Sequence, residues 1–264
     1  MSVEQAMFGR CQINHFDEID STSNWLTTHR AELNDWTIAV ADFQSAGRGR
    51  LGRTWVAPPG TALMMSILVR PNWSLDRSGW LMMIAGIAAA ETLTHASGIN
   101  IQLKWPNDLV FASRNGLQKV GGILSEAETA NGKLAEAIVG IGLNINMTHE
   151  QLPPRAHTPA ASLRTLSGKT FDRRQLQQDL LRRFQQLYDD ASRGRSPLFG
   201  WRRLLVTLGQ TVTSSKVGSD QDKVKIEGTA TGVDEWGRLE ITLADGTVQL
   251  IAAGDVTLRS PHDQ

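Results

Sequence analysis

The sequence predicts an α+β fold in which helices pack on a mixed or antiparallel sheet, followed by a small SH3-like β-barrel. Three observations predict it. Strand-like segments in the middle of the chain are joined by Asn-Gly dipeptides, which favour hairpins and therefore antiparallel neighbours rather than a doubly wound sheet. Two helical segments, 75–97 and 172–191, are long enough to cover a sheet. After Gly209, β-branched and polar residues alternate between turn signals, which is typical of a barrel of short strands.

The first seventy residues are expected to form strands around one short helix. Their β-branched and apolar residues predict strands at 13–19, 36–43 and 61–70. A helix is expected at 22–30, because Ser21 or Thr22 can accept hydrogen bonds from its first amide groups.

The middle of the chain combines a buried helix with the predicted hairpins. The helix at 75–97 is almost wholly apolar, so we expect it to be packed on both sides. Sheet segments are expected at 99–112, 117–128 and 134–146. Asn115-Gly116 and Asn131-Gly132 separate these segments and predict type I′ turns.

The remaining elements lead from a loop to the barrel. A polar, Pro-rich loop at 151–159 precedes the helix at 172–191, which carries one apolar stripe. One or two helical turns at 197–205 follow, and about five short strands are expected within 210–259.

Length and composition are those of an ordinary globular protein. The 264 residues suit one large domain, 1–208, and one small domain, 209–264. Lys plus Arg and Asp plus Glu both number 27, so the net charge is zero and no global field would hold a polyanion. The single cysteine, Cys11, excludes an internal disulfide, and six scattered histidines give no zinc-like spacing. Without a signal-peptide pattern or a bilayer-long apolar run, we expect a cytoplasmic protein with no membrane partner.

A basic glycine loop at 47–55, with the sequence GRGRLGRTW, is the strongest local motif. It follows the strand predicted to end near Gln44. Glycines let the backbone approach phosphate oxygens, and guanidinium groups are forked donors suited to phosphate and carboxylate. Such a loop can close over a triphosphate, but a solvated loop or an RNA contact would use the same residue types. The loop lacks the Gly-Lys-Ser/Thr ending of a P-loop.

Two further motifs place charge beside strands. In the block 104–108, KWPND, Pro106 must interrupt the strand, and Lys104 and Asp108 meet there in a combination that suits phosphate and magnesium. Lys119 lies at the start of another strand segment and is followed by Gly121-Gly122, which leave room for a flat ligand. By itself, such a strand lysine is more often only solvated.

Taken in order, five motifs resemble the biotin protein ligase family. They are DST at 20–22, QSAGRGRLGRTW at 44–55, KWPNDL at 104–109, KVGGIL at 119–124 and GIGLNIN at 140–146. The resemblance implies a fold like that of class II aminoacyl-tRNA synthetases. It also implies a two-step reaction, in which biotin and MgATP form biotinyl-5′-AMP and the biotinyl group passes to a lysine of a partner. The partner implied is the biotin carboxyl carrier domain of acetyl-CoA carboxylase or a similar acceptor.

The resemblance further implies which residues bind biotin. Ser21, Thr22 and Gln44 match residues that hydrogen-bond the ureido ring, and backbone groups near Gly122 complete that pocket. Lys119 matches the lysine beside the biotin carboxylate and the adenylate linkage, and it is the first candidate for a catalytic role.

For the nucleotide, the resemblance implies a second group of residues. Arg50 and Arg53 match loop residues that fold over the intermediate. Gly47 and Arg48 belong to the same binding loop, and Arg48 and Lys104 add positive charge. Trp55 matches a residue that stacks on adenine, Asn144 one that hydrogen-bonds it, and Arg259 one that reaches the nucleotide. Asp108 matches a position that either holds Mg²⁺ or orients the incoming lysine.

Two positions differ from the family pattern. Ser23 stands where Asn usually follows Ser-Thr, and Ala161 stands where Thr is common. Only about twenty residues precede the first motif, too few for a helix-turn-helix domain. We therefore expect a ligase without a DNA partner or repressor function. The sequence leaves monomer and homodimer open.

The sequence leaves three alternatives to a biotin ligase. A lipoate-protein ligase-like acyl-adenylate transferase would use the same strategy. A nucleic-acid adapter could use the basic loop, but zero net charge and few interleaved aromatic residues oppose it. A biotin sensor would bind the vitamin without releasing pyrophosphate.

Overall fold

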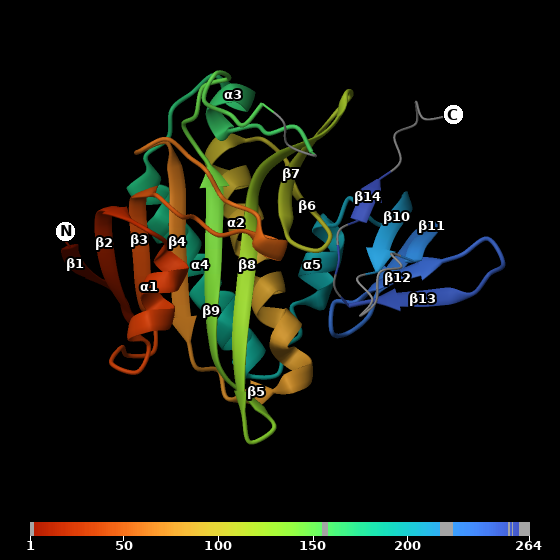
Figure 1. Cartoon of the computed structure of the whole chain (residues 1–264), viewed down its shortest axis with the longest axis horizontal. Helices are drawn as coiled ribbons and strands as arrows, with labels where there is room; N and C mark the ends of the chain where they lie inside the picture. Colours follow the sequence, from red (N-terminus) through yellow and green to blue (C-terminus); the bar gives the residue numbers. More distant parts are fainter. Residues whose placement is uncertain (1–2, 155–157, 217–223, 253, 255, 259–264) are drawn as a thin grey trace.

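The computed structural model describes residues 3–154, 158–216, 224–252, 254 and 256–258. Within these residues nine strands form one large sheet (Figure 1). They are β1 (Val3–Phe8), β2 (Cys11–Ile19), β3 (Thr37–Gln44), β4 (Ala62–Val69), β5 (Trp73–Ser74), β6 (Ile101–Lys104), β7 (Asp108–Ser113), β8 (Gly116–Ala130) and β9 (Lys133–Asn144). Their order is β1-β2-β3-β4-β9-β8-β7-β6, with β5 paired to β9. Only β2 and β3 pair in parallel among these described strands, so the sheet is mixed and the predicted α+β class is confirmed.

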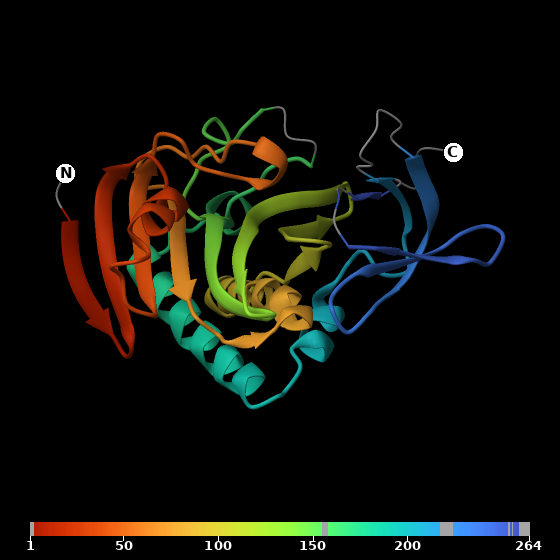
Figure 2. The ribbon, with the colours of Figure 1, turned by 60° about the horizontal axis from the view of Figure 1, so that its bottom comes forward.

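The helices divide between the two faces of this sheet. They are α1 (Thr22–His29), α2 (Ser78–Ser97), α3 (Leu163–Ser167), α4 (Arg173–Ser192) and α5 (Leu198–Leu204), with short 3₁₀ turns η1 (Arg50–Gly52) and η2 (Leu75–Arg77). Figure 2 shows α2 and α4 together on one side, and the orange segment between β3 and β4 on the other. No helix among the described residues is long and apolar enough to cross a membrane.

The main core lies between the sheet and the pair α2 and α4. Leu81 and Ile84 of α2 and Leu180 and Phe184 of α4 are fully buried in it. Burying one such side chain contributes about 1.5–3 kcal/mol. The α2 helix is buried around most of its circumference, as its apolar sequence predicts.

The two Asn-Gly dipeptides form different turns. Ala130 pairs with Lys133, and Asn131 and Gly132 between them have φ of 52° and 73°, which confirms the type I′ prediction there. At the other site Ser113 pairs with Gly116, so the turn is centred one residue earlier, on Arg114 and Asn115. The type I′ prediction at Asn115-Gly116 is therefore wrong. The Ser113 hydroxyl accepts the Asn115 amide at 3.2 Å, which stabilises the shifted turn.

Other differences from the sequence predictions are local. The segment expected at 99–112 is two strands, β6 and β7, because the chain turns at 105–107 around Pro106. The strand β1, the two-residue β5 and the single-turn helix α3 were not predicted. β1 is mostly exposed at the sheet edge, so its sequence lacks the apolar run that marks a buried strand.

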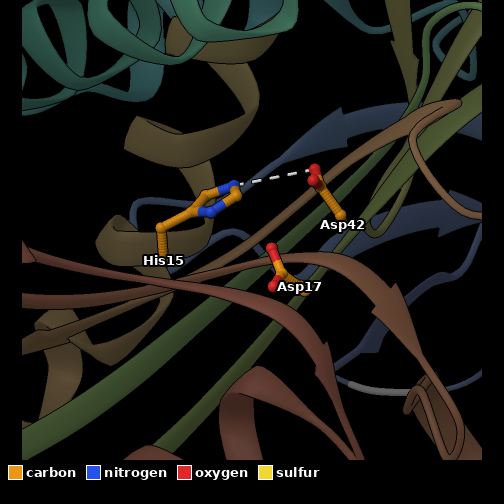
Figure 3. A group of neighbouring side chains, drawn as sticks. All are labelled: His15, Asp17 and Asp42. Carbon is orange, nitrogen blue, oxygen red and sulfur yellow. Dashed lines mark ion pairs between the residues drawn. The ribbon is translucent and has the colours of Figure 1, made fainter. Parts of the chain in front are cut away.

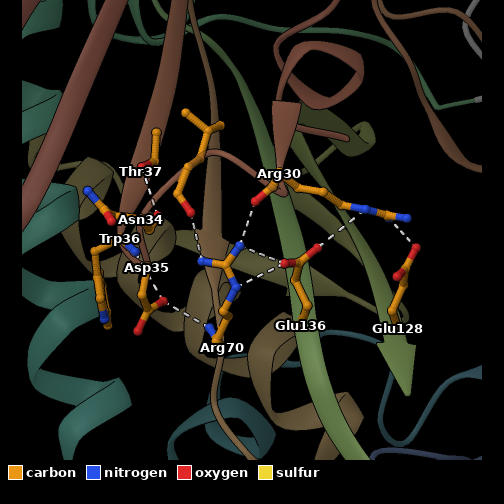
Figure 4. A network of polar contacts seen from close by, with 9 residues as sticks. Arg30, Asn34, Asp35, Trp36, Thr37, Arg70, Glu128 and Glu136 are labelled. Atoms are coloured by element: carbon orange, nitrogen blue, oxygen red, sulfur yellow. Dashed lines mark hydrogen bonds and ion pairs between the residues drawn. The ribbon is translucent and has the colours of Figure 1, made fainter. Parts of the chain in front are cut away.

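An ionic network holds the C-terminal end of α1 against the sheet (Figure 4). Arg70, just after β4, donates to the backbone oxygens of Arg30 at 2.7 Å and Leu33 at 3.0 Å. Its guanidinium also pairs with Glu136 of β9 at 2.9 Å, and Arg30 pairs with Glu128 of β8. Because these contacts fix one end of α1, they also fix where its N-terminal hydroxyl residues lie.

A second sheet of five strands follows α5. It has the order β13-β12-β11-β10-β14 and consists of β10 (Thr211–Lys216), β11 (Val224–Val233), β12 (Leu239–Thr242), β13 (Val248–Ile251) and β14 (Val256–Leu258). All its pairs are antiparallel, as an SH3-like module requires. The Trp105 indole donates to the Gly237 oxygen at 2.9 Å, and its backbone amide donates to the Thr207 hydroxyl at 2.8 Å. These buried contacts tie the small sheet to the KWPND turn. The division at 208/209 stays a prediction.

Candidate active site

A cleft of about 540 Å³ lies where the predicted motifs meet. Twelve of the fourteen predicted site residues line it: Ser21, Thr22, Gln44, Arg48, Arg50, Arg53, Trp55, Lys104, Asp108, Lys119, Gly122 and Asn144. Gly47 does not line it but shapes the loop that does. Arg259 lies outside the described residues. The structure therefore brings together motifs that are separated by more than a hundred residues in the sequence.

One end of the cleft is polar and comes from the parallel pair of strands. Ile19 of β2 pairs with Gln44 of β3, so the start of α1 lies beside the Gln44 side chain. The Ser21 side chain caps α1 by accepting the Asn24 amide at 3.4 Å. Thr22 donates its backbone amide to Gln44 Oε1 at 2.8 Å. Thr22 and Gln44 are thus held by one another and offer hydroxyl and amide groups to a ligand.

The wall beside this end is made of glycines. Gly122 of β8 faces Gly142 of β9 across the sheet, and the Trp55 indole lies against them. A Cβ on Gly142 would stand 2.8 Å from the Trp55 ring, so only glycine fits under the ring in this position. Trp55 Nε1 is buried and has no partner among the described residues. The wall therefore combines a flat aromatic surface with an unused N–H donor.

The arginine loop is held at several points. The Trp55 amide donates to the Gly47 oxygen at 2.9 Å, and a Cβ on Gly47 would be 2.5 Å from the Trp55 oxygen. Gly47 is thus required for the tight return of the loop. Arg48 forms a two-pronged ion pair with Glu126. Arg50 donates to Asn107 Oδ1 at 2.9 Å and to the Gly254 oxygen at 3.3 Å, which joins the loop to the KWPND turn and the second sheet.

Lys119 and Asp108 form an ion pair inside the cleft. Lys119 Nζ lies 2.5 Å from Asp108 Oδ1, and both side chains are less than a third exposed. Val110 pairs with Lys119 and Leu109 with Gly121, so Val120 is an extra residue at a β-bulge. Bulges re-aim neighbouring side chains, and this one brings the lysine to the carboxylate. Lys104 is buried at the end of β6, where it pairs directly with Asp108 of β7.

Asn144 lies at the far end of β9. Its side chain is buried and its amide nitrogen donates to the Ala161 oxygen at 3.0 Å. One of its two N–H donors is therefore used, and the side-chain oxygen can accept a hydrogen bond from a ligand.

Several cleft residues were not predicted. Ser66 of β4 lies in the cleft and is hydrogen-bonded to Thr22, and Asn107 holds Arg50. Val256 of β14 also lines the cleft, so the second sheet contributes to it. The sequence did carry a signal for Ser66, because it is the one polar residue in the apolar strand ALMMSILV.

A different group of potential metal ligands lies outside the cleft. His15, Asp17 and Asp42 gather on β2 and β3 (Figure 3). The His15 Nε2 atom is 3.6 Å from Asp42 Oδ1. Arg173 already pairs with the same Asp42 oxygen at 2.7 Å, which balances that carboxylate without a metal ion.

Comparison with known proteins gives two family matches. Residues 15–144 match the model described as biotin/lipoate A/B protein ligase family. Residues 207–259 match the model described as biotin protein ligase C terminal domain.

Curated relatives and solved structures agree with these matches. The bifunctional ligase/repressor BirA of Bacillus spizizenii is 31% identical over 247 residues, which cover 92% of this chain and 72% of that protein. The biotin–[acetyl-CoA-carboxylase] ligase of Mycobacterium tuberculosis is 31% identical over 227 residues, 84% of this chain and 79% of that protein. Among solved structures, the biotin protein ligase from Aquifex aeolicus in complex with biotin and ATP superimposes with a TM-score of 0.75 at 29% identity. That match covers 94% of this chain and 98% of the other.

Proposed function

Because this chain belongs to the biotin protein ligase family, we propose that it activates biotin with ATP and transfers it to a lysine of a biotin carboxyl carrier domain. The similar ligase from Aquifex aeolicus binds both biotin and ATP, and the Mycobacterium tuberculosis relative is named for acetyl-CoA carboxylase as its acceptor.

In the first step a carboxylate attacks a polyanion. One oxygen of the biotin carboxylate bonds to the α-phosphorus of ATP, the bond to the bridging oxygen breaks, and pyrophosphate leaves. The two anions repel each other unless nearby positive charge balances them. Lys119, Arg48 and Arg50 line the cleft together, and their cations supply this balance. The partners of Lys119 and Arg48 are the carboxylates of Asp108 and Glu126, so substrate anions would compete with carboxylates for these cations.

Biotin is expected at the polar end of the cleft. Its ureido ring has two N–H donors and one carbonyl oxygen, and Ser21, Thr22 and Gln44 carry matching groups. The glycine at 122 keeps the strand surface flat enough for the bicyclic ring. A buried polar ring selects strongly against analogues that lack its hydrogen bonds.

ATP is expected on the side of Trp55 and Asn144. The indole supplies a surface for adenine. One Asn144 N–H is held by the Ala161 oxygen, which orients the side chain, and its amide oxygen can accept from the adenine amino group. Arg53 and Lys104 line the cleft and would contact phosphates, and Arg259 keeps its proposed role at the nucleotide.

Magnesium fits one position of this site. Asp108 is the only carboxylate among the described residues that line the cleft, and Mg²⁺ is commonly held by one or two carboxylates plus substrate phosphates. Bound there, the ion would neutralise phosphate charge. The pairing of Asp108 with Lys119 also suits its alternative role of orienting the acceptor lysine.

In the second step the acceptor lysine replaces AMP. Its neutral amine attacks the carbonyl carbon of the adenylate, a C–N bond forms, the C–O bond to AMP breaks, and the amine loses a proton. The loop at 47–55 lies over the cleft and would shield this mixed anhydride from water. Cytoplasmic location and the absence of repressor function stay predictions.

The observation that carries the proposal is the meeting in one cleft of the Lys119–Asp108 pair, the arginine loop and the Thr22–Gln44 pair. The test is pyrophosphate release from MgATP by the purified protein with biotin, with lipoate and with neither. An acceptor domain and its Lys→Arg variant are then added, and their masses are measured. We expect release with biotin alone and a mass gain only on the acceptor that keeps its lysine.

Two outcomes would contradict the proposal. Equal turnover with lipoate would favour the lipoate branch, whose members share the matched family model. Biotin binding without pyrophosphate release would favour a sensor.

A further inference from the structure

Three buried hydroxyl groups lie in a row at the polar end of the cleft. Thr22 Oγ1 is 2.8 Å from Ser66 Oγ, which is 2.9 Å from Ser23 Oγ. All three residues line the cleft, and Ser66 is 1% and Ser23 6% exposed. The row begins at the Gln44 side chain, because the Thr22 hydroxyl is also 3.1 Å from Gln44 Oε1.

One backbone amide fixes the direction of every hydrogen bond in this row. The Thr22 N–H can only donate, so the Gln44 atom 2.8 Å from it must be the amide oxygen. That oxygen can only accept, so the Thr22 hydroxyl donates its single proton to it. Thr22 must then accept from Ser66. The Ser66 proton is now used as well, so Ser66 accepts from Ser23.

A directed row presents lone pairs to a ligand rather than protons. Each hydroxyl oxygen has two lone pairs, and Thr22 and Ser66 each use only one within the row. The donor at this end is the Gln44 amide nitrogen, which lies 3.3 Å from Met64 Sδ, a weak acceptor. Gly140 leaves space beside the row, since a Cβ there would stand 3.1 Å from Ser23 Oγ.

We propose that Ser66 and Ser23 are positioning residues that keep the Thr22 hydroxyl an acceptor and so select a ligand ring with N–H donors. The inference rests on the proposed function, in which that ring is the ureido ring of biotin. Ser23 is the position where the family pattern usually has Asn, so here a row of hydroxyls takes over the polar end of the pocket. If an oxygen replaced an N–H of the ring, its lone pairs would face those of the Thr22 hydroxyl oxygen, and the two groups would repel each other.

The test measures dissociation constants by calorimetry for biotin, for ATP and for a biotin analogue in which a ring oxygen replaces one ureido N–H. Wild type is compared with Ser66→Ala, Ser23→Ala and the matched control Ser214→Ala. Ser214 is equally buried, in the second sheet, and its hydroxyl has no partner among the described residues.

We expect Ser66→Ala and Ser23→Ala to raise the Kd for biotin on the order of tenfold, because each leaves a buried polar partner unsatisfied. The Kd for ATP should stay unchanged, and Ser214→Ala should match wild type for every ligand. The preference for biotin over the oxygen analogue should fall on the order of tenfold in Ser66→Ala, since Thr22 then lacks the Ser66 donor that opposes any turn of its own proton away from Gln44. If Ser66 had a merely structural role, Ser66→Ala would weaken the binding of biotin and of the oxygen analogue alike, and the preference between them would not change.

Failure of the hydroxyl row and failure of the proposed function give different results. Wild type that binds biotin, with both variants unchanged in affinity and preference, would overturn the hydroxyl row. Wild type that binds no biotin would overturn the proposed function and the row with it. If Ser66→Ala fails to fold in a melting experiment, Ser23→Ala decides alone, since alanine suits its helical position.

Discussion

The two faces of the large sheet differ in what the same strands present to them. On β9, Val139 and Leu143 are buried in the core, whereas Gly140 and Gly142 line the cleft. On β4, Ile67 belongs to that core and its neighbour Ser66 to the cleft. Side chains alternate along a strand, so stability and ligand recognition depend on adjacent residues.

One face of the sheet is closely packed against helices, whereas the opposite face carries small residues that leave room for a ligand. Branched aliphatic residues meet the helices at close packing, and any lost methylene leaves a void. Glycines and a hydroxyl keep the opposite surface low, so an added methyl group at Gly142 would meet Trp55 and one at Gly140 would meet Ser23. Changes at neighbouring positions should therefore affect different properties.

The largest effect is expected for Lys119→Ala on the cleft face. Loss of a cation beside the reacting carboxylate and phosphate should lower biotin-dependent pyrophosphate release by about 10²–10³-fold. The melting temperature should change little, because the lysine is partly exposed. Lys133→Ala, in the exposed hairpin at the start of β9, is the matched control and should turn over normally. Equal rates in the two variants would remove Lys119 from the chemistry.

Leu143→Ala tests the filled face. Leu143 is fully buried in the core and does not line the cleft, so its truncation should lower the free energy of unfolding by about 2–5 kcal/mol. Urea unfolding measures this, and the KM values for biotin and ATP should stay near those of wild type. A large rise in either KM without loss of stability would break the division between the faces.

Cys11, which is buried on the filled face, makes the stability of the protein depend on pH. Burial raises the pKa of its thiol to about 11 from 9.0, and Arg10 offsets part of this rise. The folded protein therefore holds the thiol proton more tightly than the unfolded chain does. Stability is unaffected below pH 9 and falls as the pH rises through 11, by up to about 3 kcal/mol. Unfolding of wild type and Cys11→Ala should diverge across this range, and parallel curves would contradict the prediction.

Gly142→Ala tests the open face, one residue from Leu143. Its Cβ would stand 2.8 Å from the Trp55 ring, so the ring must move from the wall. We expect the KM for ATP to rise on the order of tenfold, while stability changes by less than about 1 kcal/mol because the ring can turn toward solvent. In a Trp55→Ala background the same substitution should add nothing further. Additive effects would show that Gly142 acts without Trp55.

Much of the fold and the site could be predicted because the signals are local. The Asn131-Gly132 turn, the N-terminal cap of α1 and the apolar α2 follow from turn chemistry and periodicity. Strand β1 could not be predicted in this way, since an exposed edge strand has no buried face to mark it. The exact turn at Arg114-Asn115 also escaped, because a side-chain hydrogen bond from Ser113 outweighed the Asn-Gly preference.

The class of fold and the chemical groups of the site follow from local sequence, since motif composition dictates which donors, acceptors and charges exist. Which of these groups act together depends on contacts between segments that are distant in the chain. The parallel pairing of β2 with β3 sets Thr22 beside Gln44, and the bulge at Val120 sets Lys119 on Asp108. Hydrogen-bond direction depends on neighbours that lie far apart in the chain. For that reason Ser66, an ordinary polar residue in a buried strand, acquires a role only where α1 meets β4.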